Sequence, residues 1–89
     1  MTAVTIGDQK VDVRFELATR HHGWESFVYS PMTQSSWLLK VKQIGEGHYI
    51  QYVAALYHQD EVYDLPVSPN RKHLRNNVAR VVLGYDPVA

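Results

Sequence analysis

The 89-residue chain contains no cysteine, so neither a disulfide framework nor a thiolate metal site is available to it. It also lacks any apolar run that approaches the roughly 20 residues of a membrane span. The first ten residues, MTAVTIGDQK, do not have the basic and apolar regions of a secretion signal. These absences predict a single soluble domain, cytoplasmic and unprocessed, that contacts no membrane.

Net charge is absent as well, because nine lysines and arginines balance nine aspartates and glutamates. This balance argues against a DNA-binding protein that relies on overall positive charge, and against an acidic protein that mimics DNA. An electrostatic partner would have to recognise a local patch. Little charge repulsion opposes self-association in a chain with 45% hydrophobic residues, so we also expect that a homodimer is compatible with the sequence.

Acidic residues are missing in particular between Asp64 and Asp86, where the clearest helix signal lies. Ser68 is suited to cap the helix and Pro69 to occupy its first position, while Gly84 can supply the left-handed residue that ends it. We therefore predict one C-terminal helix over about 69–83, followed by a frayed tail, 86–89. Five apolar residues recur at helical spacing and predict its buried stripe: Leu74, Val78, Val81, Val82 and Tyr85.

The remainder of the chain has the pattern of antiparallel strands. Ala3 to Ile6 and Lys10 to Ala18 flank a short glycine-containing turn and predict a hairpin. Further strands are expected at 24–30, 36–44, 48–58 and 62–66. The predicted fold class is α+β: about five antiparallel strands, joined as hairpins, packed against the C-terminal helix in one domain that spans residues 1–89.

Alternation along the returning strand places apolar residues on both faces of this sheet. Ile50, Tyr52, Ala54 and Leu56 share one face, and Tyr49, Val53, Ala55 and Tyr57 share the other. A single helix covers one face of a sheet. The second face must therefore meet the N-terminal hairpin, a second subunit or another partner.

The five histidines do not have the spacing of a metal site, and no Walker loop, dinucleotide fingerprint, G-x-S-x-G elbow or H-E-x-x-H helix is present. His58 and Asp60 could pair with any of five serines (Ser26, Ser30, Ser35, Ser36 and Ser68), which is too permissive a pattern to indicate a catalytic triad. We predict no catalytic residue, no metal ligand and no cofactor, and hence a protein that is not an enzyme.

Two groups of side chains are candidates for contact with a partner. Basic residues follow one arc of the helix, where they are either simply solvated or form a docking surface for phosphates or an acidic partner. Aromatic residues offer large, rigid contact areas, with core filling as the alternative. The predicted partner-binding residues are Arg71, Lys72, Arg75, Arg80, Tyr49, Tyr57 and Trp24.

We therefore expect a small interaction module that binds another protein or protein complex, including a nucleoprotein, through a sheet face and the basic helix face. By class analogy, inhibitors of defence complexes and other accessory proteins of bacteria and phages have this profile. Nucleic-acid binding is a less favoured alternative. Three strands followed by a basic helix are similar in order to the C-terminal half of a double-stranded RNA-binding domain, which implies phosphate contacts at Arg71, Lys72 and Arg75. A homodimeric structural protein is a further alternative.

Overall fold

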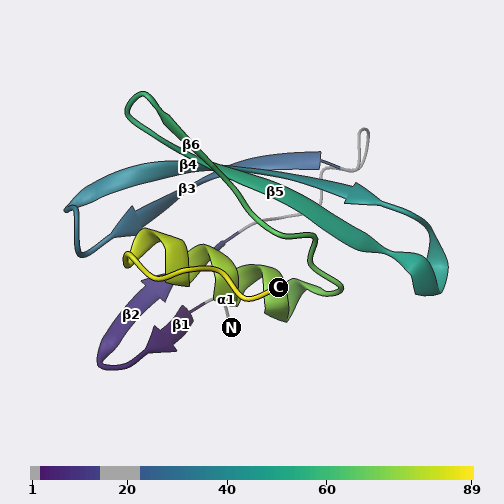
Figure 1. The fold of residues 1–89 in the computed structure, drawn as a ribbon, viewed down its shortest axis with the longest axis horizontal. Helices are drawn as coiled ribbons and strands as arrows, with labels where there is room; N and C mark the ends of the chain where they lie inside the picture. The colour runs from purple at the N-terminus through teal and green to yellow at the C-terminus, as the bar shows by residue number, and fades with distance from the viewer. Residues whose placement is uncertain (1–2, 15–22) are drawn as a thin grey trace.

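The computed structural model describes residues 3–14 and 23–89, and within them it contains two antiparallel sheets and one α-helix (Figure 1). The smaller sheet is a hairpin of β1 (Ala3–Ile6) and β2 (Gln9–Asp12), which turns at Gly7 with a φ of +63°. β2 is shorter than the predicted run from Lys10 to Ala18, and the part of that run from residue 15 onward lies outside the described residues.

The larger sheet is a four-stranded meander in the order β3-β4-β5-β6. Its strands are β3 (Gly23–Ser30), β4 (Ser35–Ile44), β5 (Gln51–His58) and β6 (Glu61–Asp64), and each pairs antiparallel with the next. The predicted α+β class with antiparallel strands and a C-terminal helix is confirmed. The strands are divided between two sheets instead of forming one, because the N-terminal hairpin pairs only with itself among the described strands.

The connection between β4 and β5 is longer than the sequence pattern predicts. A 3-10 helix, η1 (Gly47–Tyr49), occupies the place where the returning strand was expected to begin, so the assignment of Tyr49 to that strand is wrong. Gly45 permits the compact turn, since its φ is +79° and a Cβ at this position would collide with the carbonyl oxygen of Tyr49.

The helix, α1 (Arg71–Val82), begins two residues later than predicted and is capped by Asn70. The Asn70 side chain accepts a hydrogen bond of 2.8 Å from the backbone N–H of His73. The prediction of Ser68 as the cap is wrong because the Ser68 backbone extends the sheet. It exchanges two hydrogen bonds, of 2.8 and 2.9 Å, with the backbone of Tyr52. Gly84 ends the helix region with a φ of +88°, as predicted.

The buried stripe of α1 agrees with its predicted members except at one end. Leu74, Val78, Val81 and Val82 are buried, whereas Tyr85 is 51% exposed, so its inclusion in the stripe is wrong. The chain leaves the helix direction at Gly84, and the Tyr85 ring then lies beside the Arg80 guanidinium, 5.6 Å from centroid to carbon.

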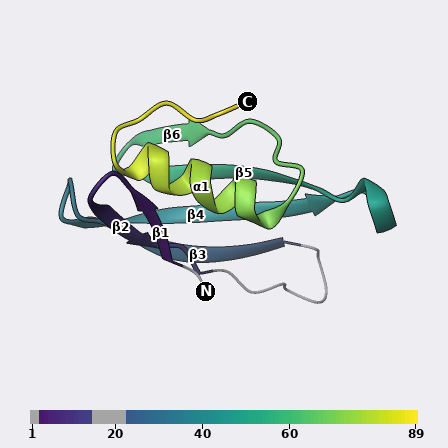
Figure 2. The ribbon, with the colours of Figure 1, turned by 90° about the horizontal axis from the view of Figure 1, so that it is seen from below.

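The helix and the N-terminal hairpin lie on the same side of the four-stranded sheet (Figures 1 and 2). We call the covered side the inner face and the opposite side the outer face. Inner-face residues of β3, β4 and β5 meet the helix stripe and Val11 and Val13 in a continuous core. The buried Ser30 hydroxyl donates a 2.5 Å hydrogen bond to the carbonyl of Val82, which ties the end of α1 to β3.

The C-terminal tail is held against the helix instead of being free, contrary to the expected fraying. The buried Asn77 amide donates to the Val88 carbonyl and accepts from the Val88 N–H, both at 2.8 Å. Arg80 adds a hydrogen bond of 2.6 Å to the carbonyl of Asp86. Separately, the only α-helix in the described part of the chain is not long and apolar enough to cross a membrane.

Candidate protein-interaction surface

A line of apolar side chains crosses the outer face of the four-stranded sheet. The strand register aligns Phe27 with Leu38, Leu38 with Tyr57, and Tyr57 with Val62, one residue from each strand. We call these four residues the apolar row. Phe27 is 72% exposed and Val62 is 55% exposed. Among residues 3–14 and 23–89, no helix or strand covers this row (Figures 1 and 2).

The parity of the strands explains why these side chains point outward. Val28, Leu39 and Leu56 are sequence neighbours of row members on β3, β4 and β5, and each is fully buried on the inner face. Successive residues of a strand point to opposite faces, so burial of these three neighbours fixes the apolar row on the other side. The fold that buries these three residues in the core therefore leaves the apolar row exposed.

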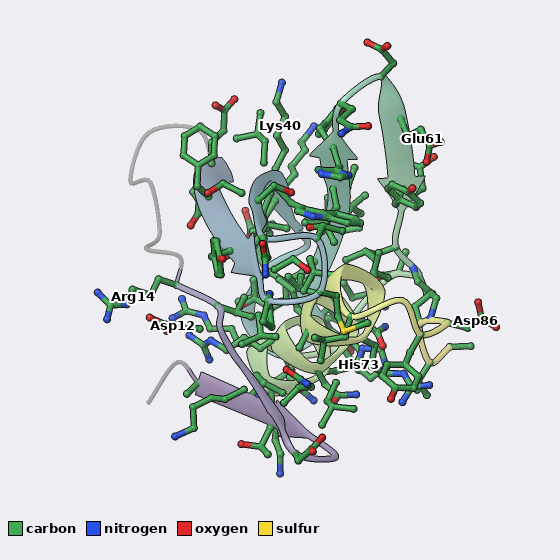
Figure 3. All side chains as sticks on the ribbon, turned by 90° about the vertical axis from the view of Figure 1, so that its left-hand side faces the viewer. Asp12, Arg14, Lys40, Glu61, His73 and Asp86 are labelled. Carbon is green, nitrogen blue, oxygen red and sulfur yellow. The ribbon has the colours of Figure 1, made fainter. Side chains whose placement is uncertain are left out.

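A second line, one step along the strands, carries charge beside the apolar row. It consists of Glu25, Lys40, Ala55 and Asp64, which the register aligns in that order, and we call it the charged row. The Lys40 ammonium lies 3.8 Å from the Glu25 carboxylate and 5.0 Å from the centre of the Tyr57 ring. Figure 3 shows Lys40 projecting from the sheet on the side away from α1.

The small side chain of Ala55 leaves a hollow in the charged row. The hollow has a volume of about 190 Å³ and is lined by Lys40, Lys42, Val53 and Asp64 among others. On the other side of the apolar row, Tyr29 is 56% exposed and is paired with Ser36. The outer face thus combines an apolar ridge, a neighbouring hollow and charges of both signs.

The aromatic residues proposed from the sequence have different positions. Tyr57 belongs to the apolar row, where it is half-buried between its neighbours. Tyr49 is 83% exposed but lies on η1, beyond the end of β5. Trp24 is 8% exposed and packs edge-on against Tyr52, with 5.9 Å between ring centres, so it belongs to the core and not to a docking surface.

The basic residues of the helix lie on the inner side of the sheet, away from the apolar row, and three of them, Arg71, Arg75 and Arg80, are engaged within the chain. Arg71 donates to the Tyr52 hydroxyl at 3.3 Å, and Arg80 bonds the tail as described above. Lys72 is exposed. Lys72 and Arg75 line a groove of about 770 Å³ between β1 and the first half of α1, together with Asn70, His73 and Asn76 on the helix side. The sheet face and the basic arc therefore form two separate surfaces.

The structure brings one of the five candidate serines, Ser35, to His58. The Ser35 hydroxyl lies 2.8 Å from Nε2 of His58 and 2.8 Å from the Thr33 hydroxyl, which in turn accepts from the indole N–H of Trp37 at 3.0 Å. The imidazole stacks on the Trp37 ring at 4.3 Å. Within the described residues no carboxylate bonds to His58, so the pair lacks the orienting group of a catalytic triad.

Tyr63 extends this aromatic cluster on the inner face, with its ring centre 5.2 Å from that of Trp37. Its hydroxyl donates to the Glu61 carboxylate, which lies two residues away on β6. This hydrogen bond raises the pKa of the Tyr63 phenol above its ordinary value of 10.0, with contributions from desolvation and from the Glu61 charge. The cluster joins the β3–β4 turn to β5 and β6.

Sequence reasoning missed three members of the apolar row, namely Phe27, Leu38 and Val62. Alternation along each strand places them on a face, but only the register between strands places them in one line. Within the described residues, no three side chains of the types that bind metals gather closely enough to hold an ion. The two adjacent histidines of the sequence, His21 and His22, lie outside those residues.

Comparison of the chain with protein-family models, with curated proteins and with solved structures finds no match.

Proposed function

We propose that this protein is a small interaction module that docks onto a protein partner through the outer face of its four-stranded sheet. The observation that carries the proposal is the apolar row, which crosses all four strands without a covering element among the described residues. Single exposed apolar residues are common on protein surfaces, whereas contiguous apolar patches mark interaction sites.

The chemistry of the row fits a protein partner. Phe27 and Tyr57 supply rigid aromatic area, and full burial of a side chain such as Phe27 is worth about 1.5–3 kcal/mol. The neighbouring charges, Lys40 and Glu25, suit the polar rim that surrounds the centre of an interface. An inhibitor or an accessory subunit needs only such a binding surface in order to act. The more specific form of our proposal is therefore that this chain is an inhibitor or an accessory subunit of a bacterial complex.

Site-specific photo-cross-linking tests the proposal. A benzophenone side chain introduced at Phe27 samples the outer face, and the same group at Tyr85 is the matched control, since both positions are exposed aromatic residues. We expect protein adducts from position 27 and few from position 85 in cell extract. Equal adduct formation at the two positions, or none at position 27, would refute the outer face as the docking surface.

A second candidate function, nucleic-acid binding, has one specific feature in its favour. The groove between β1 and α1 presents Lys72, His73 and Arg75, and none of the described residues that line it is acidic. Contacts to phosphate would make binding strongly dependent on salt. Titration of duplex RNA at about 100 mM salt tests this candidate. Binding that is weakened by Lys72→Glu would favour it, and absence of binding at low salt would exclude it.

A further inference from the structure

We infer that the groove between β1 and α1 binds an acidic, extended segment of a partner protein, which adds to the free edge of β1 as a third strand. This surface is separate from the outer face, so the inference does not depend on docking there. The same groove carries the second candidate function, and the strand edge beside it distinguishes the two ligands. The alternating donors and acceptors of a strand edge match a peptide backbone, whereas a line of phosphates offers acceptors only.

The free edge of β1 presents unpaired backbone groups. Within the described part of the chain, β1 pairs with β2 alone. Ile6 and Gln9 close a two-residue turn, in which Gly7 has the positive φ of the first position of a type II′ turn. This closing pair exchanges hydrogen bonds, and such pairs alternate with pairs that do not, so the N–H and C=O groups of Ala3 and Thr5 point away from β2. No backbone hydrogen bond connects either residue to another element among the described residues.

β1 also lacks the features that protect the free edge of a sheet. Its sequence, AVTI, contains no charged residue and no proline, and Ala3 and Thr5 are exposed. The larger sheet ends in β6, which carries Glu61 and Asp64 at its own free edge. A two-stranded hairpin is marginal by itself and a third strand stabilises it. Strand addition is therefore expected at β1 and not at β6.

The side of the groove that α1 forms selects an acidic strand. Lys72, Arg75 and His73 line it together with the amides of Asn70 and Asn76, and none of the described lining residues is acidic. Lys72 is exposed, so a carboxylate placed in the groove can pair with it. A second copy of this chain fits poorly, because pairing of β1 with β1 would bring two sets of helix cations together.

The rules of strand pairing fix which side chains of the added strand face the helix. Val4 and Ile6 pack against the core on the side of β1 that lies against α1, and a residue directly opposite either of them points the same way (Figure 2). In an antiparallel addition, the residues between those positions exchange hydrogen bonds with Ala3 and Thr5. The preferred segment therefore has an acidic residue at every second position, with uncharged strand-forming residues such as threonine between them.

Fluorescence anisotropy with a labelled synthetic peptide tests the inference. The probe has about eight residues of alternating glutamate and threonine, enough to span β1, and the control peptide has the same composition with all its glutamates in one block. We expect the alternating peptide to bind with a dissociation constant of about 100 μM or lower, and the block peptide to bind at least about tenfold more weakly. Lys72→Glu should weaken binding of the alternating peptide about fivefold or more. Lys42→Glu makes the same charge change on the outer face and should leave binding unaltered.

Blocked amide hydrogens test the addition of a strand. N-methyl groups on the threonines of the peptide remove the donors that face β1 and should abolish binding, whereas N-methyl groups on the glutamates should not. On the protein, Thr5→Pro removes an outward N–H at a strand edge, where proline is tolerated, and Thr5→Ala keeps that N–H. We expect only the proline variant to lose binding. The methylated peptides leave the protein unaltered, so they decide the matter if Thr5→Pro disturbs the hairpin.

Several outcomes overturn the inference. The alternating peptide does not bind at about 1 mM protein, or the block peptide binds equally well, which would mean that charge alone is recognised. Retention of binding by both N-methylated peptides, or loss only with the methylated glutamates, contradicts antiparallel addition to β1. A chain that binds duplex RNA and not the peptide also overturns the inference, and it favours the second candidate function.

Discussion

Adjacent apolar residues on the two faces of the four-stranded sheet have opposite environments. On β4, Leu39 is fully buried, while its neighbour Leu38 belongs to the row on the outer face. On β3, Val28 is fully buried and the adjacent Phe27 is 72% exposed. The difference arises because the helix and the hairpin both lie on one side. Hydrophobic composition therefore does not decide which face becomes the core; the positions of the covering elements decide it.

The two adjacent leucines of β4 give the strongest test of this comparison. We expect Leu39→Ala to lower the free energy of unfolding by about 2–5 kcal/mol, because it opens a cavity in the closed core. The same change at Leu38 removes a partly exposed side chain and should cost about 1 kcal/mol in the monomer. Urea denaturation of the two variants measures the difference.

Dilution supplies the control for this pair of leucines. If the outer face is buried against a second copy, the cost of Leu38→Ala should grow with protein concentration, because the dimer adds to the stability of the folded chain. The cost of Leu39→Ala should change much less. Equal costs at low concentration would show that both faces are covered in the folded monomer, and the distinction between them would then be lost.

Two serines test the same comparison for polar groups. Ser30→Ala removes the buried hydroxyl that donates to the Val82 carbonyl and leaves that acceptor without its donor. We expect a loss of about 1–3 kcal/mol in the free energy of unfolding. Ser36→Ala, on the exposed outer face, should change it by less than about 0.5 kcal/mol. Thermal denaturation followed by circular dichroism measures both, and a similar effect of the two changes would contradict the assignment of faces.

The inner face was more predictable from the sequence than the outer one. Alternation identifies Tyr52, Ala54 and Leu56 as one face of β5, and helical spacing identifies most of the stripe that covers them. These patterns depend only on local periods. The N-cap was misassigned because Ser68 and Asn70 are both good caps, and the pairing of Ser68 with Tyr52 through the sheet decides between them.

The candidate site was less predictable because it depends on register. Nothing local aligns Phe27 with Leu38, Tyr57 and Val62, which come from four strands. The contact of Ser35 with His58 has the same origin, since the two residues meet only after β4 and β5 pair. Trp24 illustrates the opposite case: an aromatic residue favoured as a contact from composition became part of the core when its strand acquired a covered face.

The ion pair on the outer face should contribute less to the free energy of unfolding than the inner-face contacts tested above. Glu25 and Lys40 are 3.8 Å apart and both are largely exposed, so solvent and salt screen their attraction. We expect Glu25→Gln to change the free energy of unfolding by about 0–1 kcal/mol at low salt and by less at high salt. Chemical denaturation at two salt concentrations checks this, with Lys40→Gln as the reciprocal variant.

The smallest expected effect on stability involves Tyr63 on β6, the strand whose neighbouring residue, Val62, belongs to the outer face. The Glu61 carboxylate accepts a hydrogen bond from the Tyr63 hydroxyl and so raises the pKa of the phenol above 10.0. The folded chain holds the phenol proton more tightly than the unfolded chain does, so the hydrogen bond contributes to the stability of the fold below pH 10.0. This contribution is lost as the pH rises through the raised pKa of Tyr63.

The absorbance of the wild type at alkaline pH, minus that of Tyr63→Phe, reports the ionisation of the Tyr63 phenol alone. We expect the difference to titrate above pH 10.0 in the wild-type background and closer to 10.0 when both chains carry Glu61→Gln, since the amide lacks the negative charge. Near neutral pH the phenol is protonated in every variant that retains it. A titration midpoint that does not respond to Glu61→Gln would mean that the two side chains do not interact in solution, and the inner-face cluster would then end at Tyr63.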